Sequence, residues 1–227
     1  RITMLTLYTS IGHLTTQKTQ NGTVIPVVQT GGHAYALAPR ELLLWSSLAF
    51  QILTKEEAQV SYINQLVPSQ LSDEPDFAYI LRRLLMRGIV IQGGGVTGVE
   101  ALYRLLAQMH IVPVKDSLFT RCIACFRAWR HGHIPFSMFP HYLKKPSCTP
   151  METLILKLSE ELSFSVAELL GHMEYSTNVP TQNDLDSVTA VMKIDDLAEQ
   201  VTLHHVQLPV LQGIANLYLK KQILLER

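Results

Sequence analysis

The sequence predicts an α+β protein that is mainly helical, and three observations lead to this class. Apolar residues make up 47% of the 227 positions and charged residues only 17%, which suits a packed core and argues against disorder as the dominant state. Segments rich in strand-forming residues and separated by turn residues fill the first 37 positions. From residue 38 onward, apolar residues recur mostly at helical spacing.

The N-terminal region is predicted to form β-hairpins. The segment Met4–Thr9 is rich in strand formers, and Asn21-Gly22 separates two further strand-like runs. Asn-Gly tolerates positive φ at both positions, so we expect a two-residue hairpin turn there. Gly31-Gly32 predicts a second reversal. Pro26 lies inside one of these strands and lacks a backbone N–H, which predicts that its strand lies at a sheet edge.

Three helices are predicted between residues 38 and 88. Pro39 suits the first turn of the first helix. Thr54 followed by Glu57 forms a capping-box pattern that begins the second. The third begins at Ser72 or Asp73 and ends at Gly88, a typical C′ glycine. A short strand to residue 92 and a flexible tip at residues 93–95 follow.

This order of three helices, a glycine stop, a strand and a glycine-rich tip resembles a winged helix-turn-helix. Pro39–Gln92 carries the resemblance, and Asp76–Gln92 (DFAYILRRLLMRGIVIQ) is its most typical part, since a helix followed by L-x-x-x-G-I-V is the usual join between recognition helix and wing. The resemblance implies that the third helix enters the major groove of DNA and that Gly93-Gly94-Gly95 forms the tip of a wing beside it.

The C-terminal third repeats the theme, which predicts tandem winged-helix units. Thr149-Pro150 begins an amphipathic helix, and Asp195–Val201 with Pro209–Lys221 suggests a helix–turn–helix. Leu84–Ile91 (LLMRGIVI) and Leu217–Leu224 (LYLKKQIL) share a helix end, a basic residue and a strand-like run. The helix expected over residues 164–175 and the polar loop over 176–186 are interpreted as insertions in this second, degenerate copy.

Three domains follow from this organisation. Residues 1–110 hold the hairpins, the first unit and a helix over 99–109. Residues 111–148 form a helical and proline-rich bridge, and residues 149–227 form the second unit. Six Lys and Arg residues against one acid lie between Lys115 and Ser147, whereas ten acids and two lysines lie between Met151 and Gln200. The net charge of zero argues against coating nucleic acid by bulk charge, but a local basic face remains.

The predicted DNA contacts are polar residues on the two recognition helices and on the bridge. Arginine grips phosphate or reads guanine, and amides read adenine. A solvated helix face is the competing interpretation of the same residues. The candidates are Tyr79, Arg82, Arg83, Arg87, Arg127, Arg130, Gln212, Asn216 and Lys220.

The turn Gly93–Gly98 (GGGVTG) satisfies G-x-G-x-x-G, follows a predicted strand and precedes a helix, and Asp116 comes eighteen residues later. Such a turn holds a pyrophosphate at a helix N-terminus in flavin-dependent oxidoreductases and other dinucleotide-binding proteins. A lone βαβ unit cannot bury both of its faces, however, and three helices precede this one. Nucleotide binding is therefore the third functional hypothesis.

No metal, cofactor or catalytic site is predicted. Cys122 and Cys125 with His131, His133, His141 and Cys148 have the residue types of a zinc site, but only one C-x-x-C is present and small core residues fit the helical spacing better. Adjacent His204 and His205 are expected in a turn and point different ways. The sequence has no G-x-S-x-G elbow, so an enzyme is not predicted.

The protein is expected to be cytoplasmic. Its sequence has no apolar run of about 18 residues that could span a membrane, no signal-peptide pattern and only three cysteines. The leading hypothesis is a bacterial-type transcriptional regulator that binds double-stranded DNA. Its acidic second unit is expected to pair with another protomer, giving a homodimer, or with a protein partner. The alternative hypothesis is an adaptor whose winged helices bind protein and not DNA.

Overall fold

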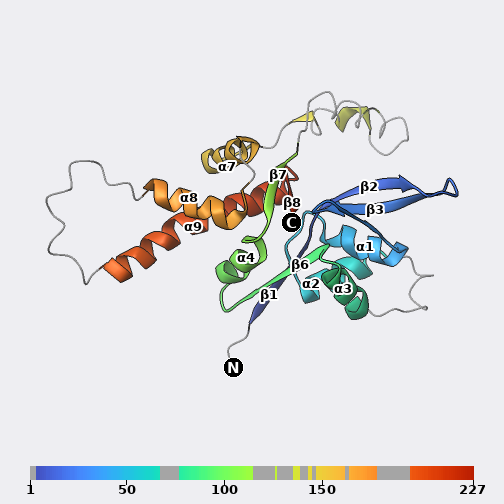
Figure 1. Ribbon diagram of the computed structural model, residues 1–227, viewed down its shortest axis with the longest axis horizontal. Helices are drawn as coiled ribbons and strands as arrows, with labels where there is room; N and C mark the ends of the chain where they lie inside the picture. Colours follow the sequence, from blue (N-terminus) through green and yellow to red (C-terminus); the bar gives the residue numbers. More distant parts are fainter. Residues whose placement is uncertain are drawn as a thin grey trace.

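A computed structural model describes residues 4–66, 77–114, 126, 135–138, 143–144, 147–161, 164–177 and 195–227, without side chains for 136, 174–177 and 195–206. Helices pack with three small antiparallel sheets in a mixed α/β fold (Figure 1). The mainly helical α+β prediction is confirmed at this level. In the predicted bridge, a 3-10 turn at Phe136–Met138 is described, and most of the remaining bridge residues lie outside the described residues.

The predicted hairpins are present. Strands β2 (His13–Lys18), β3 (Val24–Thr30) and β4 (His33–Ala36) form one sheet, and the β2–β3 hairpin projects from the body of the molecule (Figure 1). The β3–β4 turn has the two-residue form, with positive φ at both glycines. The β2–β3 loop is longer than predicted. Lys18 pairs with Val24 and the Thr19 N–H donates to the Thr23 carbonyl, so the loop runs from Gln20 to Gly22, and Gly22 takes the left-handed conformation.

The edge position predicted from Pro26 is wrong, because β3 is the central strand of its sheet. The Pro26 carbonyl accepts a hydrogen bond from the Leu37 N–H at 3.4 Å, and β4 ends just before, at Ala36. The missing proline N–H therefore faces the point where the neighbouring strand has already ended. A central strand tolerates proline there because no ladder hydrogen bond is lost.

The first unit contains α1 (Pro39–Leu48), β5 (Leu53–Thr54), α2 (Lys55–Ile63), α3 (Phe77–Met86) and β6 (Val90–Gly95). Its sheet has the order β5-β1-β6, with β1 (Leu5–Ser10) in the middle, so the strand that pairs with β6 comes from before α1.

The local signals read in this unit are confirmed. Thr54 caps α2 with the reciprocal Glu57 bonds, and Gly88, at φ 68°, ends α3. The predicted start of α3 at Ser72 or Asp73 lies outside the described residues.

The flexible tip predicted at Gly93-Gly94-Gly95 is wrong, because these residues belong to β6 and pair with Leu7, Thr6 and Leu5 of β1. Helix α4 (Gly98–Leu106) lies directly on this strand. A Cβ at Gly93 would overlap the backbone of Ala101 and Leu105, and a Cβ at Gly95 would overlap the backbone at Glu100 and Ala101. The glycines let a helix approach the sheet closely and do not provide flexibility.

The second unit has the same order of elements. Strand β7 (His110–Pro113) precedes α7 (Pro150–Glu161), α8 (Val166–Thr177), α9 (Asp195–Leu219) and β8 (Ile223–Glu226). β7 pairs with β8 and, through His110, with Ser165, just as β1 pairs with β6 and β5. The domain boundary predicted between residues 110 and 111 falls inside β7.

The helix–turn–helix predicted over residues 195–221 is wrong, because α9 is one continuous helix with Pro209 inside it. Proline removes one helical hydrogen bond, but residues 204–208 include no glycine or asparagine that would favour a turn. His204 and His205 accordingly lie in a helix. The segment interpreted as an inserted helix, α8, is instead the counterpart of α2.

Candidate nucleic-acid interface

Helix α3 buries one face and presents the other to solvent. Its buried residues, Phe77, Ile80, Leu81 and Leu84, recur at helical spacing and pack into one core with Leu44 and Leu48 of α1. The positions between them therefore point outward. Tyr79, Arg82, Arg83 and Met86 are exposed, and no acidic residue lies between Phe77 and Met86.

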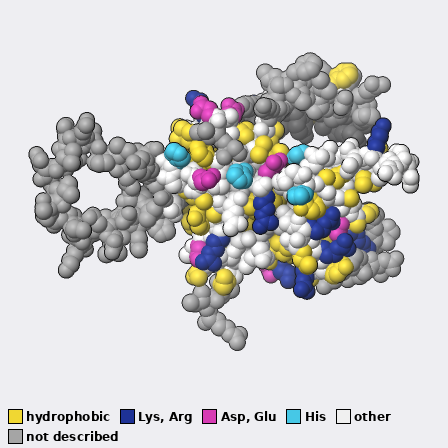
Figure 2. Space-filling model, in the orientation of Figure 1, with side chains coloured by type: hydrophobic (Ala, Val, Ile, Leu, Met, Phe, Trp, Pro, Cys, Tyr) yellow, Lys and Arg dark blue, Asp and Glu magenta, His cyan; other side chains and the backbone are white. Residues whose placement is uncertain are grey.

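The outer face of the first unit is basic. Figure 2 shows Lys and Arg side chains gathered over the region of the three helices α1 to α3. Arg83 is about half exposed, and its guanidinium lies 5.8 Å from the centre of the Tyr79 ring. Arg82 points to solvent from the preceding position. An arginine pair beside an aromatic ring can grip phosphate and stack on a sugar or a base.

A buried carboxylate fixes α3 to α1. Glu41 of α1 is only 4% exposed, and its Oε2 accepts hydrogen bonds from Arg87 Nη1 at 3.0 Å and from the Ala38 N–H at 3.0 Å. Arg83 Nη2 forms a second ion pair with Oε1 at 3.1 Å. Arg87 also donates to the Ala36 carbonyl at 2.6 Å and lies over the Tyr35 ring. Arg87, predicted to contact DNA, is thus an internal clamp.

The second unit repeats this clamp position for position. Glu152 of α7 is 1% exposed and lies 2.8 and 2.9 Å from Lys220 Nζ. The Thr149 N–H donates to Glu152 Oε2 at 2.9 Å, and Lys220 donates to the Ser147 carbonyl at 3.0 Å. Lys220, predicted to contact DNA, joins α9 to α7 in this way.

The two clamps share one spacing along the chain. The same interval in sequence separates each residue of the first clamp from its counterpart in the second: Glu41 from Glu152, Ala38 from Thr149, and Ala36 from Ser147. The capping bonds of the next helix keep that interval, because Ser165 and Glu168 form the same reciprocal pair as Thr54 and Glu57. These equivalent contacts therefore belong to an internal repeat.

The ends of the third helices also correspond. The Ile89 N–H donates to the Leu84 carbonyl, and the Gln222 N–H donates to the Leu217 carbonyl in the same way. Lys221 accordingly takes φ 58° in the place of Gly88. The two segments that resemble each other in sequence, Leu84–Ile91 and Leu217–Leu224, therefore also share their helix-end hydrogen bond and a residue with positive φ.

The clamp keeps the Glu152 carboxylate charged. Desolvation is the largest influence and raises its pKa, but the hydrogen bonds from Lys220 and the Thr149 N–H, the charge of Lys220 and a hydrogen bond with Asn216 outweigh it. The net effect lowers the pKa of Glu152 below its ordinary 4.5.

Of the other residues predicted to contact DNA, two lie on α9 and two lie outside the described residues. Gln212 and Asn216 of α9 are exposed, but Asn216 bonds to Glu152 and the adjacent Lys221 lies over the Phe50 ring. Between residues 207 and 221, both lysines are therefore engaged within the molecule. Arg127 and Arg130 lie outside the described residues. The structure thus brings Tyr79, Arg82 and Arg83 together on one helix face and does not join them to the α9 candidates.

The two buried carboxylates, and Met86, which is 80% exposed on α3, were not among the residues predicted from the sequence. A signal for the carboxylates was present, because Pro39-Arg40-Glu41 and Pro150-Met151-Glu152 both place proline at the first helical position and glutamate at the third. Such a glutamate reaches back to the N-cap N–H.

The turn at Gly93–Gly98 already contains a carboxylate. Thr97 caps α4, the Glu100 N–H donates to Thr97 Oγ1 at 3.1 Å, and Glu100 Oε2 accepts from the Val96 N–H at 2.8 Å. The strand before the turn, β6, pairs with β1 in an antiparallel manner, and every other strand pair among the described residues is antiparallel too. The dinucleotide-binding fold is instead built on parallel strands. Asp116 lies outside the described residues.

Within the described part of the chain, no three His, Cys, Asp or Glu residues lie close enough to hold a metal ion. Cys148 contacts Gln222 Oε1 at 3.0 Å, and the other five residues considered for zinc lie outside the described residues. No helix that the structure describes has the length and apolarity required to cross a membrane.

Comparison of the chain with protein-family models, with curated protein sequences and with solved structures finds no match.

Proposed function

We propose that this protein binds double-stranded DNA through the outer face of α3, as a regulator of transcription with two winged-helix units. The observation that carries the proposal is the set Tyr79, Arg82 and Arg83, which projects from a helix without acidic residues. In this proposal α3 is the recognition helix, and each unit is a winged helix whose central sheet strand precedes its first helix.

The Glu41 clamp supports this role because it makes the helix rigid at its C-terminal end. Arg87 ties the last turn of α3 to the start of α1, and Arg83 contacts the same carboxylate from one turn earlier. A recognition helix that is already fixed loses little conformational entropy when it binds DNA. Arg83 is also half exposed, so its second guanidinium edge is available to a phosphate.

The second unit has a different role in the proposal. Its equivalent helix, α9, presents Gln212, Asn216 and the half-exposed Leu219, while Lys220 is held by Glu152. A helix face whose described cations are already engaged contributes little to DNA affinity, since affinity comes mainly from phosphate neutralisation. We assign this unit to a protein partner or to a second protomer.

The test is fluorescence anisotropy with a labelled short duplex of mixed sequence at low salt. Replacing Arg82 and Arg83 by alanine should raise Kd at least tenfold, about 1.4 kcal/mol. Arg82→Ala alone should weaken binding in the same direction without touching the clamp. The matched control is Arg104→Ala, an exposed arginine on α4 paired with Glu100, which should leave Kd unchanged. Equal losses in Arg104→Ala and Arg82→Ala would contradict the proposal.

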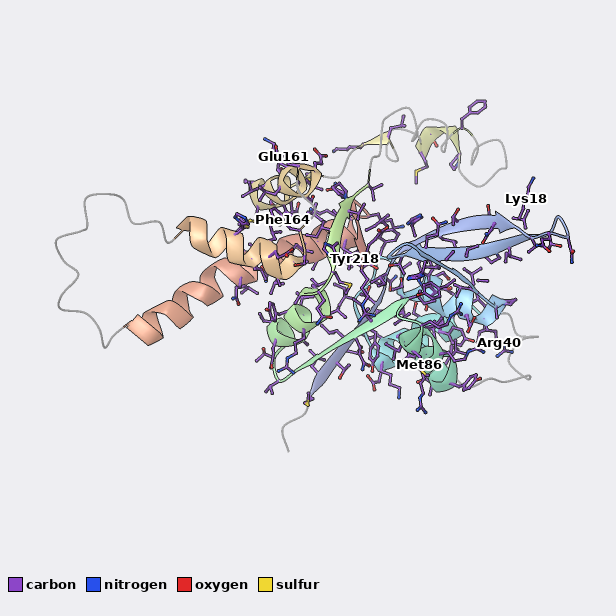
Figure 3. All side chains as sticks on the ribbon, in the orientation of Figure 1. Lys18, Arg40, Met86, Glu161, Phe164 and Tyr218 are labelled. Atoms are coloured by element: carbon purple, nitrogen blue, oxygen red, sulfur yellow. The ribbon has the colours of Figure 1, made fainter. Side chains whose placement is uncertain are left out.

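A second candidate is protein recognition by the same helices. Large apolar side chains are exposed on α2 and α3: Val60, Ile63, Tyr79 and Met86, the last on the outer side of α3 (Figure 3). Exposed apolar side chains that form a contiguous patch mark a site of interaction with a protein partner. Failure of the wild-type protein to bind any duplex at low salt, together with loss of a co-purifying protein in Met86→Glu, would favour this adaptor function.

A further inference from the structure

The outer edge of β6 has backbone groups that face away from its own sheet. The Ile11 N–H donates to the Ile89 carbonyl, and the register pairs Ser10 with Val90, so alternate residues from Ile89 face β1. Val90, Gln92 and Gly94 therefore direct their N–H and carbonyl groups outward. Arg104 Nη1 donates a hydrogen bond to the Gly94 carbonyl at 3.1 Å, as expected if that carbonyl faces away from β1.

A cleft of about 240 Å³ runs along this edge. Its floor and walls come from the end of α3, from β6 and from α4, and Arg227, at the end marked C in Figure 1, closes one side. Gly88, Val90, Gln92, Arg104, Gln108 and Arg227 are among the residues that line it.

The internal repeat shows what this edge can accept. Ile89 and Gln222 are equivalent, and Gln92 and Leu225 each lie three residues after them, so Leu225 of β8 is the counterpart of Gln92. The Leu225 carbonyl also faces away from its own sheet. That carbonyl accepts a hydrogen bond from the Gly12 N–H at 2.8 Å, so the edge of the second unit already contacts an additional stretch of backbone. The same position in the first unit, at Gln92, is exposed and has no such backbone partner among the described residues.

The charge of the cleft selects the occupant. Its two ionisable lining residues are Arg104 and Arg227, and none of its lining residues is acidic. Arg104 is partly neutralised by Glu100 at 2.7 Å, whereas Arg227 has no ion pair within the described part of the chain. Gly88 makes room for the Arg227 guanidinium, which lies 3.0 Å from the position of a Cβ at that glycine. A carboxylate in the cleft would meet two guanidinium groups.

We infer that the β6 edge is a docking site for an extended, acidic peptide segment of a partner protein, which adds to the β5-β1-β6 sheet as a fourth strand. Backbone hydrogen bonds to Gln92, which is exposed, supply the affinity, and the two arginines select acidic side chains. The site lies away from the Tyr79, Arg82 and Arg83 face and does not depend on DNA binding.

The probes are two fluorescein-labelled hexapeptides, Val-Glu-Val-Glu-Val-Glu and its lysine counterpart, titrated into the full chain. The glutamate peptide should bind saturably and at least tenfold more tightly than the lysine peptide. Gln92→Pro removes the outward N–H and should weaken binding at least tenfold, whereas Gln92→Ala keeps it and should bind as the wild type does. Arg104→Ala with Arg227→Ala should remove the preference for glutamate.

Since proline at position 92 risks unfolding the strand, the wild-type protein supplies the second measurement. On addition of the glutamate peptide, the amide signals of Val90 and Gln92 should shift most in ¹⁵N NMR spectra, and Arg82→Ala plus Arg83→Ala should leave the affinity unchanged. Absence of saturable binding, equal affinity for both peptides, or shifts centred on Arg82 and Arg83 would each overturn the proposal.

Discussion

At the scale of residues, two buried carboxylates determine how each unit is assembled. Glu41 and Glu152 are almost fully buried, and an unpaired charge in such a place would be strongly unfavourable. Each is compensated by a cation from the end of the third helix of its unit and by the N–H of its own N-cap residue. The two differ in their cations, because Glu41 has two arginine partners whereas Glu152 has a single lysine, with Asn216 as a neutral hydrogen-bond partner.

This difference predicts unequal costs for removing the cation. Lys220→Met leaves Glu152 buried without a cation and should lower the free energy of unfolding by about 3 kcal/mol. Arg87→Met leaves Arg83 beside Glu41 and should cost about half as much. Urea unfolding at pH 7 followed by circular dichroism measures both. An equal or larger loss for Arg87→Met would contradict the assigned partners.

At the scale of elements, the glycine-rich segment determines how α4 lies on the sheet. Gly93 and Gly95 face α4, whereas a Cβ at Gly94 would have Met4 Cε at 3.6 Å as its nearest neighbour, which is ordinary contact. The alternation follows from the strand period of two. The three glycines are therefore not equivalent.

Alanine substitutions separate their roles. Gly93→Ala should destabilise the protein by about 3 kcal/mol, because the new methyl group would force α4 away from β6. Gly94→Ala is the matched control and should change stability by less than about 0.5 kcal/mol. Thermal or urea unfolding of the two variants gives the comparison. Similar stability of both variants would mean that α4 does not pack on β6 as described.

The elements predicted correctly from the sequence are those specified by local chemistry. The Thr54 and Glu57 capping box, the Gly88 stop and the Gly31-Gly32 turn act within a few residues, so their consequences can be read locally. The strand that pairs with β6 could not be predicted in this way. It is β1, which precedes all three helices of the unit, and no local sequence signal indicates a pairing over that distance. Pro209 was misread for the same reason, since tertiary packing against α7 and α8 outweighs one lost helical bond.

The exposed face of α3 was predicted from the sequence, whereas the internal contacts at the helix ends were not. Tyr79, Arg82 and Arg83 could be placed on that face because the apolar stripe of α3 leaves them opposite the core. The internal partners of Arg87 and Lys220 could not be predicted, because a basic residue at a helix end has the same appearance in sequence whether it faces solvent or a buried acid. Only the position of Glu41 or Glu152 in three dimensions distinguishes the two cases.

At the scale of the whole molecule, Tyr218 joins the two units. It belongs to α9, yet its hydroxyl donates to the Ser10 carbonyl at 2.8 Å and accepts from the Phe50 N–H at 3.0 Å, with Thr9 Oγ1 at 3.0 Å (Figure 3). Its ring packs on Phe50 at 5.4 Å, and burial raises the pKa of the phenol. Because the neutral hydroxyl is the favoured form, this junction should weaken as pH rises above the ordinary value of 10.0.

Removing one hydroxyl tests this junction. Tyr218→Phe leaves the Phe50 N–H and the Ser10 carbonyl without their partner and should cost about 1–3 kcal/mol. Tyr62→Phe is the matched control, because the buried Tyr62 hydroxyl has no hydrogen-bond partner among the described residues, and it should cost nothing measurable. Amide exchange should also quicken at Phe50 in the first variant alone. Unchanged exchange there would mean that Tyr218 does not hold the units together.

If α3 holds DNA by its two outward arginines, as we propose, the salt dependence of binding must change when they are removed. Each neutralised phosphate contributes about −0.9 to the slope of log K against log salt. The double variant Arg82→Ala with Arg83→Ala should therefore have a slope shallower than the wild type by about 2, with Arg104→Ala unchanged. The same slope in the wild type and the double variant would contradict the account.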